Sequence, residues 1–255
     1  VKRAGALAGI HVERIVNEPS AAALASYFTA NEEQNMLVFD FGGGTLDVSL
    51  VDCFDTMVEI VSVAGNNRLG GDDFDRLIAE HFLREHGVAR QQLRAQEYAV
   101  LLKQAERCKK LLSEQDEVVM HATVGDQLYE STYTMDRLFE ESKALLKEIR
   151  QVIGRALKDG KMTIHDVDLV VMAGGSSKMP LIQKYIRHLF HKAPMVQGNC
   201  DELIALGLGL VCGVKERKEE IKDYILTDIC PFSLGVATIN EADPDRAYMA
   251  NIINR

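Results

Sequence analysis

The sequence predicts an α/β fold in which one sheet carries an inserted α+β subdomain. Short apolar segments alternate with segments of helical periodicity, as in proteins whose helices cover a sheet. Two of the apolar segments, residues 36–39 and 167–173, are each followed by a glycine-rich turn. Residues 72–158 interrupt the alternation with a helix–hairpin–helix pattern. We therefore expect a sheet with helices around it and a smaller unit inserted between its strands.

The N-terminal part of the chain is expected to supply the first strands of the sheet. An Ala-rich helix covers residues 20–28, because Pro19 precedes it and Ser20 can cap it. Residues 1–9 have the pattern of the end of another helix. The expected strands have apolar runs or alternating polarity, and they are residues 10–16, 36–39, 46–51 and 57–64.

The inserted unit and the last part of the chain follow the same patterns. Thr134 can cap a single long helix that reaches residue 157. Gly125 and Asp126 are expected to form a tight turn between two strands. The remaining helices cover residues 72–86, 91–113, 180–190 and 202–214. The remaining strands cover residues 117–124, 128–134, 167–173 and 233–239.

Charge and composition exclude several classes of protein. The net charge of −9 disfavours a nucleic-acid partner, because binding a phosphate backbone needs clustered Lys and Arg. No apolar run approaches the ~18 residues that cross a bilayer, and residues 1–12 lack the layout of a signal peptide. The five cysteines have no paired spacing, which indicates reduced, buried side chains. We expect a cytoplasmic protein with neither a nucleic-acid nor a membrane partner.

Residues 40–47, Asp-Phe-Gly-Gly-Gly-Thr-Leu-Asp, are the clearest phosphate-binding element. Consecutive glycine amides can cradle phosphates, since no Cβ blocks their approach. Asp40 and Asp47 can order Mg²⁺ through water and orient an attacking water. The alternative is a plain hairpin turn, which these carboxylates and Thr45 disfavour, and the stretch does not match a Walker loop. The three glycines are Gly42, Gly43 and Gly44.

Two further stretches have the residue types of a nucleoside site. The glycine turn that begins at Gly174 precedes a helix, whose N-terminus offers amides and a dipole to an anion. An ordinary strand-to-helix turn is the alternative. In the second stretch, Lys110 could stack on a base while its neighbours bind a ribose or an adenine; a solvated charged face is the alternative. The residues of this helix face are Glu106, Lys109, Lys110 and Ser113.

Six motifs resemble, in order and spacing, the nucleotide-binding domain of the seventy-kilodalton heat-shock (DnaK-type) chaperones. They are residues 15–23, 40–47, 68–75, 106–113, 173–180 and 200–202. The resemblance covers nearly the whole chain. It implies an actin-like (ribonuclease H-like) ATPase lobe that holds ATP or ADP with Mg²⁺, and K⁺ is a further candidate ion. Residues 223–228 resemble the interdomain linker of this family, and residues 228–235 resemble the first strand of its peptide-binding domain.

The resemblance also divides the chain into segments. Residues 1–30 would end the first ATPase lobe, and residues 31–71 with 159–217 would form the core of the second. Both ends of the sequence look cut, so we expect a fragment of a longer chain. The inserted subdomain, the linker and the truncated start of the substrate-binding domain would be residues 72–158, 218–228 and 229–255.

Individual roles follow from the resemblance. Glu18 would hold Mg²⁺ through water, Asp40 would position or deprotonate the hydrolytic water, and Asp47 would help to order the metal. Thr45 would bind the γ-phosphate or the hydrolytic water. The residues against the phosphates would be Gly43, Gly44 and Gly71. The residues that form the ribose and adenine pocket would be Glu106, Lys109, Ser113, Gly175, Ser176, Lys178 and Asp201.

Two departures from the family pattern weaken the expected site. The family commonly clasps the adenine between two arginines, whereas Lys110 and Lys178 occupy these positions. Lysine lacks the planar guanidinium that stacks on a base, so we expect weaker nucleoside affinity. Residues 224–227 are less apolar than the Leu-rich linker of the family, so we expect weaker docking of this linker. The compact inserted subdomain and this atypical linker favour a specialised bacterial paralogue.

The function implied is an ATPase that drives binding and release of unfolded polypeptides. Its partners would be a J-domain co-chaperone, a nucleotide-exchange factor, and unfolded peptide on the absent substrate domain. One alternative is a non-hydrolysing, nucleotide-binding interaction module, which the retained Glu18, Asp40 and Thr45 disfavour. Another is a small-molecule kinase of the actin-like superfamily, which the linker-like residues disfavour. The exposed apolar surface of a single lobe also predicts self-association.

The first phosphate loop and the catalytic lysine of the family's first lobe are absent from these residues. We therefore expect the 255-residue chain alone to bind nucleotide poorly and to be nearly inactive. Its release of phosphate from ATP with Mg²⁺ should lie far below that of the parent protein, measured side by side. Hydrolysis near the rate of the parent would contradict this expectation.

Overall fold

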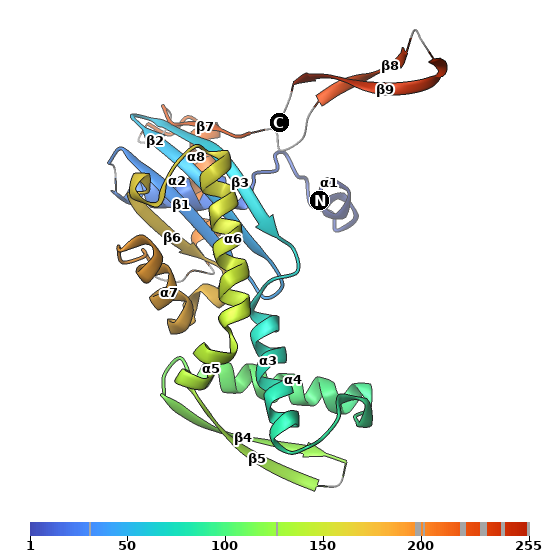
Figure 1. Cartoon of the computed structure of the whole chain (residues 1–255). Helices are drawn as coiled ribbons and strands as arrows, with labels where there is room; N and C mark the ends of the chain where they lie inside the picture. Colours follow the sequence, from blue (N-terminus) through green and yellow to red (C-terminus); the bar gives the residue numbers. More distant parts are fainter. Residues whose placement is uncertain are drawn as a thin grey trace.

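A five-stranded mixed sheet lies at the centre of the larger body of the protein (Figure 1). The computed structural model describes residues 1–30, 32–125, 127–196, 200, 202–219, 223–229, 234–240 and 243–253. In the strand order β6-β1-β2-β3-β7, β1 is parallel to β6 and antiparallel to β2. The strands are β1 (Gln34–Phe41), β2 (Leu46–Phe54), β3 (Met57–Asn66), β6 (Leu169–Ala173) and β7 (Ile225–Thr227).

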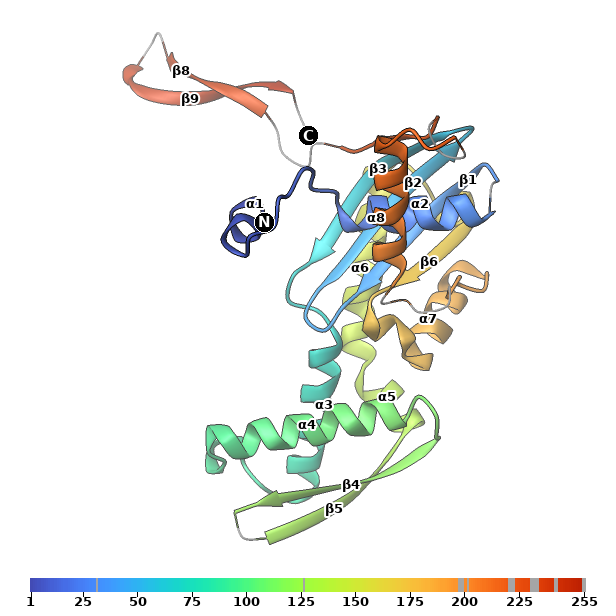
Figure 2. The same ribbon diagram turned by 180° about the vertical axis from the view of Figure 1, so that it is seen from behind.

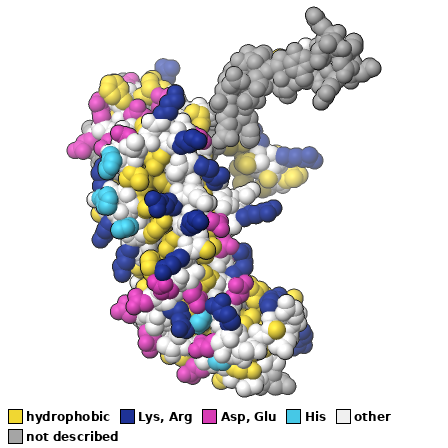
Figure 3. Space-filling view, in the orientation of Figure 1, with side chains coloured by type: hydrophobic (Ala, Val, Ile, Leu, Met, Phe, Trp, Pro, Cys, Tyr) yellow, Lys and Arg dark blue, Asp and Glu magenta, His cyan; other side chains and the backbone are white. Residues whose placement is uncertain are grey.

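Helices cover both faces of the sheet, which explains the largely apolar sequence of its inner strands. One face carries α2 (Glu18–Ala30) and α8 (Leu203–Lys215), and the other carries α6 (Lys143–Asp159) and α7 (Pro180–Phe190) (Figures 1 and 2). Successive side chains of β1 point to opposite faces. Leu37 and Phe39 belong to the core on the α6 side, whereas Met36 and Val38 belong to the core on the α2 side. Charged side chains of both signs cover the outer surface on the α6 side (Figure 3).

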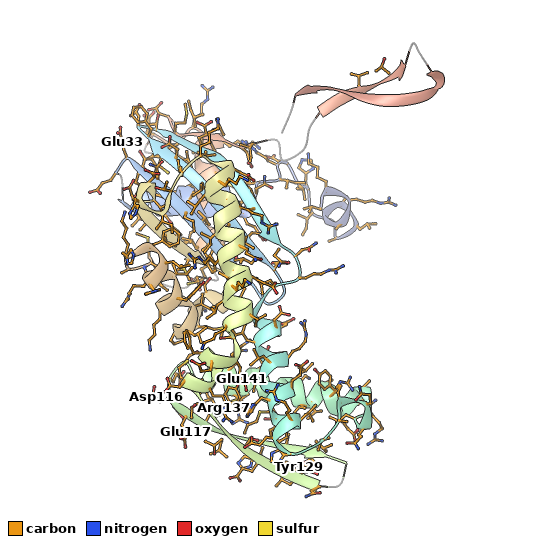
Figure 4. All side chains as sticks on the ribbon, viewed as in Figure 1. Glu33, Asp116, Glu117, Tyr129, Arg137 and Glu141 are labelled. Atoms are coloured by element: carbon orange, nitrogen blue, oxygen red, sulfur yellow. The ribbon has the colours of Figure 1, made fainter. Side chains whose placement is uncertain are left out.

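After β3 the chain builds a second unit before it returns to the sheet in α6. Its elements are α3 (Gly71–Glu85), α4 (Ala95–Leu111), β4 (Glu117–Val124), β5 (Gln127–Thr134) and α5 (Met135–Glu141). A polar network centred on Glu141 joins the β4–β5 hairpin to the helices. Glu141 accepts a hydrogen bond from the Tyr133 hydroxyl at 2.8 Å and contacts His81 Nδ1 at 2.7 Å. Arg137, also from α5, contacts the other ring nitrogen of His81 at 2.9 Å (Figure 4).

Most of the predicted strands and helices are confirmed, but three predictions are wrong. Residues 10–16 form no strand, because no neighbouring strand pairs with them in the described part of the chain. The predicted long helix is divided at Ser142, whose buried hydroxyl donates to the Phe139 carbonyl, so α5 and α6 are separate. The helix predicted from residue 91 begins only at Ala95, after a 3-10 turn. The predicted cap is confirmed, since the Thr134 side chain accepts a hydrogen bond from the backbone of α5.

The last described segments form an edge strand and a separate hairpin. β7 pairs in parallel with β3, and the Ile225 amide donates to the Thr56 carbonyl at 2.8 Å. The predicted turn residue Asp126 and the predicted strand start at residue 233 lie outside the described residues. No helix in the described part of the chain is long and apolar enough to span a membrane. The segments that extend away from the sheet in Figures 1 and 2 are α1 (Lys2–Leu7), β8 (Leu234–Asn240) and β9 (Asp243–Ile253).

The helices α2 and α8 touch backbone to backbone at Gly207. A Cβ on Gly207 would lie 1.9 Å from the Ala21 carbonyl oxygen, whereas a Cβ on the exposed Gly209 would meet no atom within 4 Å. We predict that Gly207→Ala lowers the unfolding free energy by about 1–3 kcal/mol, because the helices must separate. Gly209→Ala should raise it by about 0.5–1 kcal/mol, because alanine favours a helix. Urea unfolding of both variants tests this, and effects of the same sign would contradict it.

Candidate functional site

The carboxylates of the predicted site lie together where β1 ends and β2 begins. In the strand register, Asp40 of β1 is opposite Asp47 of β2 and beside Ala173 of β6. Glu18, the first residue of α2, is near enough to act on both carboxylates through its charge. Gly174 follows β6 with a φ of 79°, and a Cβ there would lie 2.6 Å from Asp40 Oδ1. Glycine therefore lets the chain turn directly over the Asp40 carboxylate.

Burial and electrostatic repulsion raise the pKa values of Asp40 and Asp47. Burial, and then the charges of Glu18 and Asp47, raise the pKa of Asp40 to about 6. Burial and the charge of Glu18 also raise the pKa of Asp47. Among the described residues, no group of three or more His, Cys, Asp or Glu side chains is placed to hold a metal ion directly. A cation beside the carboxylates would relieve their repulsion.

The glycine loop between β1 and β2 presents free amides. The Gly42 amide donates to the Thr45 carbonyl at 3.0 Å and closes the turn. Within the residues that the structure describes, no carbonyl accepts a hydrogen bond from the amides of Gly43 and Gly44. Both glycines are exposed, and a Cβ on Gly44 would meet no atom within 4 Å. These two amides can therefore receive an anion.

The start of α3 fixes the carbonyl side of the same loop. The amides of Gly71 and Asp72 donate to the carbonyls of Gly42 and Gly43 at 3.0 and 2.7 Å. A Cβ on Gly70 would lie 2.2 Å from the Gly43 carbonyl oxygen, so the two segments meet backbone to backbone. The Gly71 amide thus supports the loop, and the free donors belong to the loop itself.

A hollow of about 600 Å³ lies beside the loop, between α3, α4 and the turn after β6. The predicted residues that line it are Gly43, Glu106, Lys109, Lys110, Ser113, Gly175, Ser176 and Lys178. It is also lined by residues that the sequence prediction missed, namely Asp72, Asp75, Glu114 and Met179. Of these, Asp72 and Asp75 had a signal in the sequence, because they belong to the motif at residues 68–75.

The two adjacent lysines of α4 have different environments. Lys109 is buried, and its ammonium lies 2.7 Å from Asp75 Oδ1 and donates to the Gly71 carbonyl at 2.9 Å. Lys110 is exposed and pairs with Glu106, one turn earlier, at 2.6 Å, which lowers the pKa of Glu106. The predicted stacking of Lys110 on a base requires this pair to open. Exposed pairs of this kind contribute little stability, so opening is easy.

Other predicted residues lie beside the hollow or outside the described part of the chain. Asp201 is outside the described residues. The helix predicted over residues 180–190 is confirmed as α7, and the predicted turn before it takes the form of a 3-10 helix at Gly175–Lys178. The Ser177 hydroxyl stabilises this turn by donating to the Ala173 carbonyl at 2.5 Å. The predicted residues at the adjacent loop and sheet edge are Glu18, Asp40, Gly42, Gly44, Thr45, Asp47, Gly71 and Gly174.

Known proteins resemble this chain over most of its length. It is 37% identical over 246 residues to chaperone protein dnaK3 of Thermosynechococcus vestitus, and 38% identical over 251 residues to chaperone protein DnaK of Thermotoga neapolitana. It is 36% identical over 250 residues to the stromal 70 kDa heat shock-related protein, chloroplastic, of Pisum sativum. The matches cover 92%, 92% and 93% of this chain but 36%, 42% and 35% of the relatives, so the chain spans less than half of their length.

A comparison with protein-family models gives the same family as these relatives. The model described as Hsp70 protein matches residues 1–250. The predicted actin-like α/β fold and the predicted family resemblance are both confirmed by this match and by the relatives. The chain belongs to the Hsp70 family.

Proposed function

We propose that this chain is the nucleotide-binding portion of a chaperone that couples ATP binding and hydrolysis to binding and release of unfolded polypeptides. One observation carries the proposal: free glycine amides, three carboxylates and a polar hollow lie together at one end of the sheet. A hydrolysable nucleotide needs these three environments for its phosphates, its metal ion and its nucleoside. Membership of the Hsp70 family supports the same function.

The carboxylates at the sheet edge fit Mg²⁺. Glu18, Asp40 and Asp47 would hold Mg²⁺ through its water ligands, and their repulsion favours a cation beside them. When bound, Mg²⁺ would neutralise charge on the phosphates of ATP. Asp40, with a pKa of about 6, can orient a water molecule and accept its proton near neutral pH. Thr45 is exposed in the loop, and its hydroxyl would bind the γ-phosphate or that water.

The nucleoside would occupy the hollow. Ser113 follows the last turn of α4 and Ser176 lies in the opposite wall, so hydroxyls face the hollow from two sides. Lys110 and Lys178 are exposed at its margin, and neither has the planar guanidinium that stacks on a base. We infer weaker nucleoside binding than in family members with arginine at these positions. Asp201 would complete the pocket.

Residues 218–228 would act as the interdomain linker and report on the nucleotide through β7. Asp228, next to β7, accepts hydrogen bonds from Asn17 Nδ2 at 2.5 Å and from Ser20 Oγ at 3.3 Å. Glu18 lies between these two donors in the sequence. One short segment therefore contacts the linker and also carries a carboxylate of the site. The proposed partners are a J-domain co-chaperone near the linker, a nucleotide-exchange factor on the inserted unit, and unfolded peptide on a following domain. The proposed location is the cytoplasm.

The Asp40 charge should destabilise the fold in the absence of a cation. Its folded pKa of about 6 exceeds the ordinary aspartate value of 3.8. The destabilisation is therefore complete above pH 6 and fades as the pH falls towards 4. A difference of one pKa unit corresponds to about 1.4 kcal/mol, and solvent screening reduces this effect. Asp40→Asn should therefore raise the unfolding free energy at pH 7.5 by about 1–2 kcal/mol. Urea unfolding without Mg²⁺ at pH 7.5 and 4.5 tests this, and a gain that does not shrink at pH 4.5 would refute it.

Peptide-stimulated ATP hydrolysis by the full-length protein tests the proposed function. We predict that an unfolded peptide stimulates phosphate release, and that Asp40→Asn lowers the rate by about 10²-fold or more, because the group that orients the water is lost. An absence of stimulation, or an Asp40→Asn rate equal to that of the wild type, would overturn the proposal. Nucleotide binding without turnover would favour the non-hydrolysing alternative.

A further inference from the structure

Lys109 is a buried cation in the wall of the hollow. Its exposed fraction is 8%, whereas Lys110 and Lys178 in the same hollow are exposed. The Lys109 ammonium lies 2.7 Å from Asp75 Oδ1 and donates to the Gly71 carbonyl at 2.9 Å. An unpaired charge at such a position would be costly, so these two contacts make a lysine tolerable there.

Asp75 depends on Lys109 in return. Its exposed fraction is 7%, and its Oδ1 atom accepts no hydrogen bond within the described residues. The charge of this atom is balanced by the Lys109 ammonium at 2.7 Å. Burial raises the pKa of Asp75, the hydrogen bond and charge of Lys109 lower it, and the charges of Glu106 and Asp72 raise it again. Removal of either partner would therefore leave the other as an uncompensated buried charge.

The pair meets the phosphate loop at Gly71. A Cβ on Gly71 would lie 2.2 Å from Ser176 Oγ and 3.1 Å from Lys109 Nζ. The start of α3, the end of α4 and the turn after β6 thus come together at one glycine. The Gly71 amide donates to the Gly42 carbonyl, while the Gly71 carbonyl accepts from Lys109. One peptide segment therefore connects the buried ion pair to the glycine loop.

The Lys109 ammonium has more hydrogen-bond donors than its contacts within the protein use. An ammonium has three N–H donors. One of them donates to the Gly71 carbonyl, and the ammonium also forms an ion pair with Asp75 Oδ1. These two contacts hold the ammonium in the wall of the hollow, and N–H donors remain for a ligand. Lys110, in contrast, pairs on the surface with Glu106 of its own helix.

We propose that Asp75 is a positioning residue, which holds Lys109 against Gly71 so that its ammonium is offered to a ribose or phosphate oxygen of the nucleotide. This proposal rests on the proposed binding of nucleotide at the hollow. A lysine that is already oriented loses little rotamer freedom when the nucleotide binds, which favours affinity. Without the Asp75 carboxylate, the lysine would have to be ordered by the nucleotide itself.

A double-mutant cycle in the full-length protein tests the proposal. The dissociation constant of ADP with Mg²⁺ is measured by calorimetry for wild type, Asp75→Asn, Lys109→Met and the double variant. Asp75→Asn should weaken binding about tenfold, which is about 1.4 kcal/mol. The double variant should bind no more weakly than Lys109→Met, because Asp75 acts through Lys109. Independent effects that simply add, or an Asp75→Asn affinity equal to that of wild type, would overturn the proposal.

Two further variants separate positioning from folding. Asp75→Glu keeps the ion pair but displaces the ammonium, so ADP binding should weaken severalfold while urea unfolding stays close to that of wild type. Glu80→Gln removes a charge from an exposed position of the same helix and should bind ADP like wild type. If Asp75→Glu binds ADP as tightly as Glu80→Gln, the proposal fails although nucleotide binding stands. If wild type itself binds no ADP, the proposed function fails, and this proposal fails with it.

Discussion

The register of β1 between β6 and β2 is the constraint on which the site depends. Because Asp40 is paired with Asp47 on one side and Ala173 on the other, the turns after β1 and β6 emerge at the same edge. A slip of one residue in the pairing would turn all side chains of β1, including Asp40, to the opposite face of the sheet. Buried side chains on both faces of β1 prevent such a slip. The geometry of the site is thus set by packing on either side of the strand.

The same edge carries the least favourable electrostatics of the sheet. Three acidic groups act on one another near a buried strand end, and their charges and burial raise the pKa values of two of them. The free glycine amides nearby also leave hydrogen-bonding capacity unused. Both features oppose stability in the isolated fold, and both suit a ligand that brings a cation and phosphate oxygens. The arrangement is therefore better explained by binding than by folding.

Periodicity and glycine turns were enough to predict most of the strands and their covering helices, whereas the gathering of eight residues around one hollow was predicted from the family resemblance. The sequence could not predict the break at Ser142, because a buried serine that bonds to the preceding turn leaves the helical pattern unchanged. A turn was predicted before α7, but not its 3-10 form. The Lys109–Asp75 pair was also missed, since contacts between different helices depend on how those helices pack. Lys109 itself was predicted as a ligand contact, but its surroundings were not.

β7 lies at the edge of the sheet, so the sheet can exist with or without this strand. β7 pairs with β3 over three residues, and its side chains are exposed or half-buried. The other four strands carry the large buried side chains, and β7 adds the half-buried Leu226 to the core on the α2 side. A sheet with β7 and a sheet without β7 can therefore share the same core. Pairing and release of β7 can act as a two-state switch, because the rest of the molecule stays folded in both states.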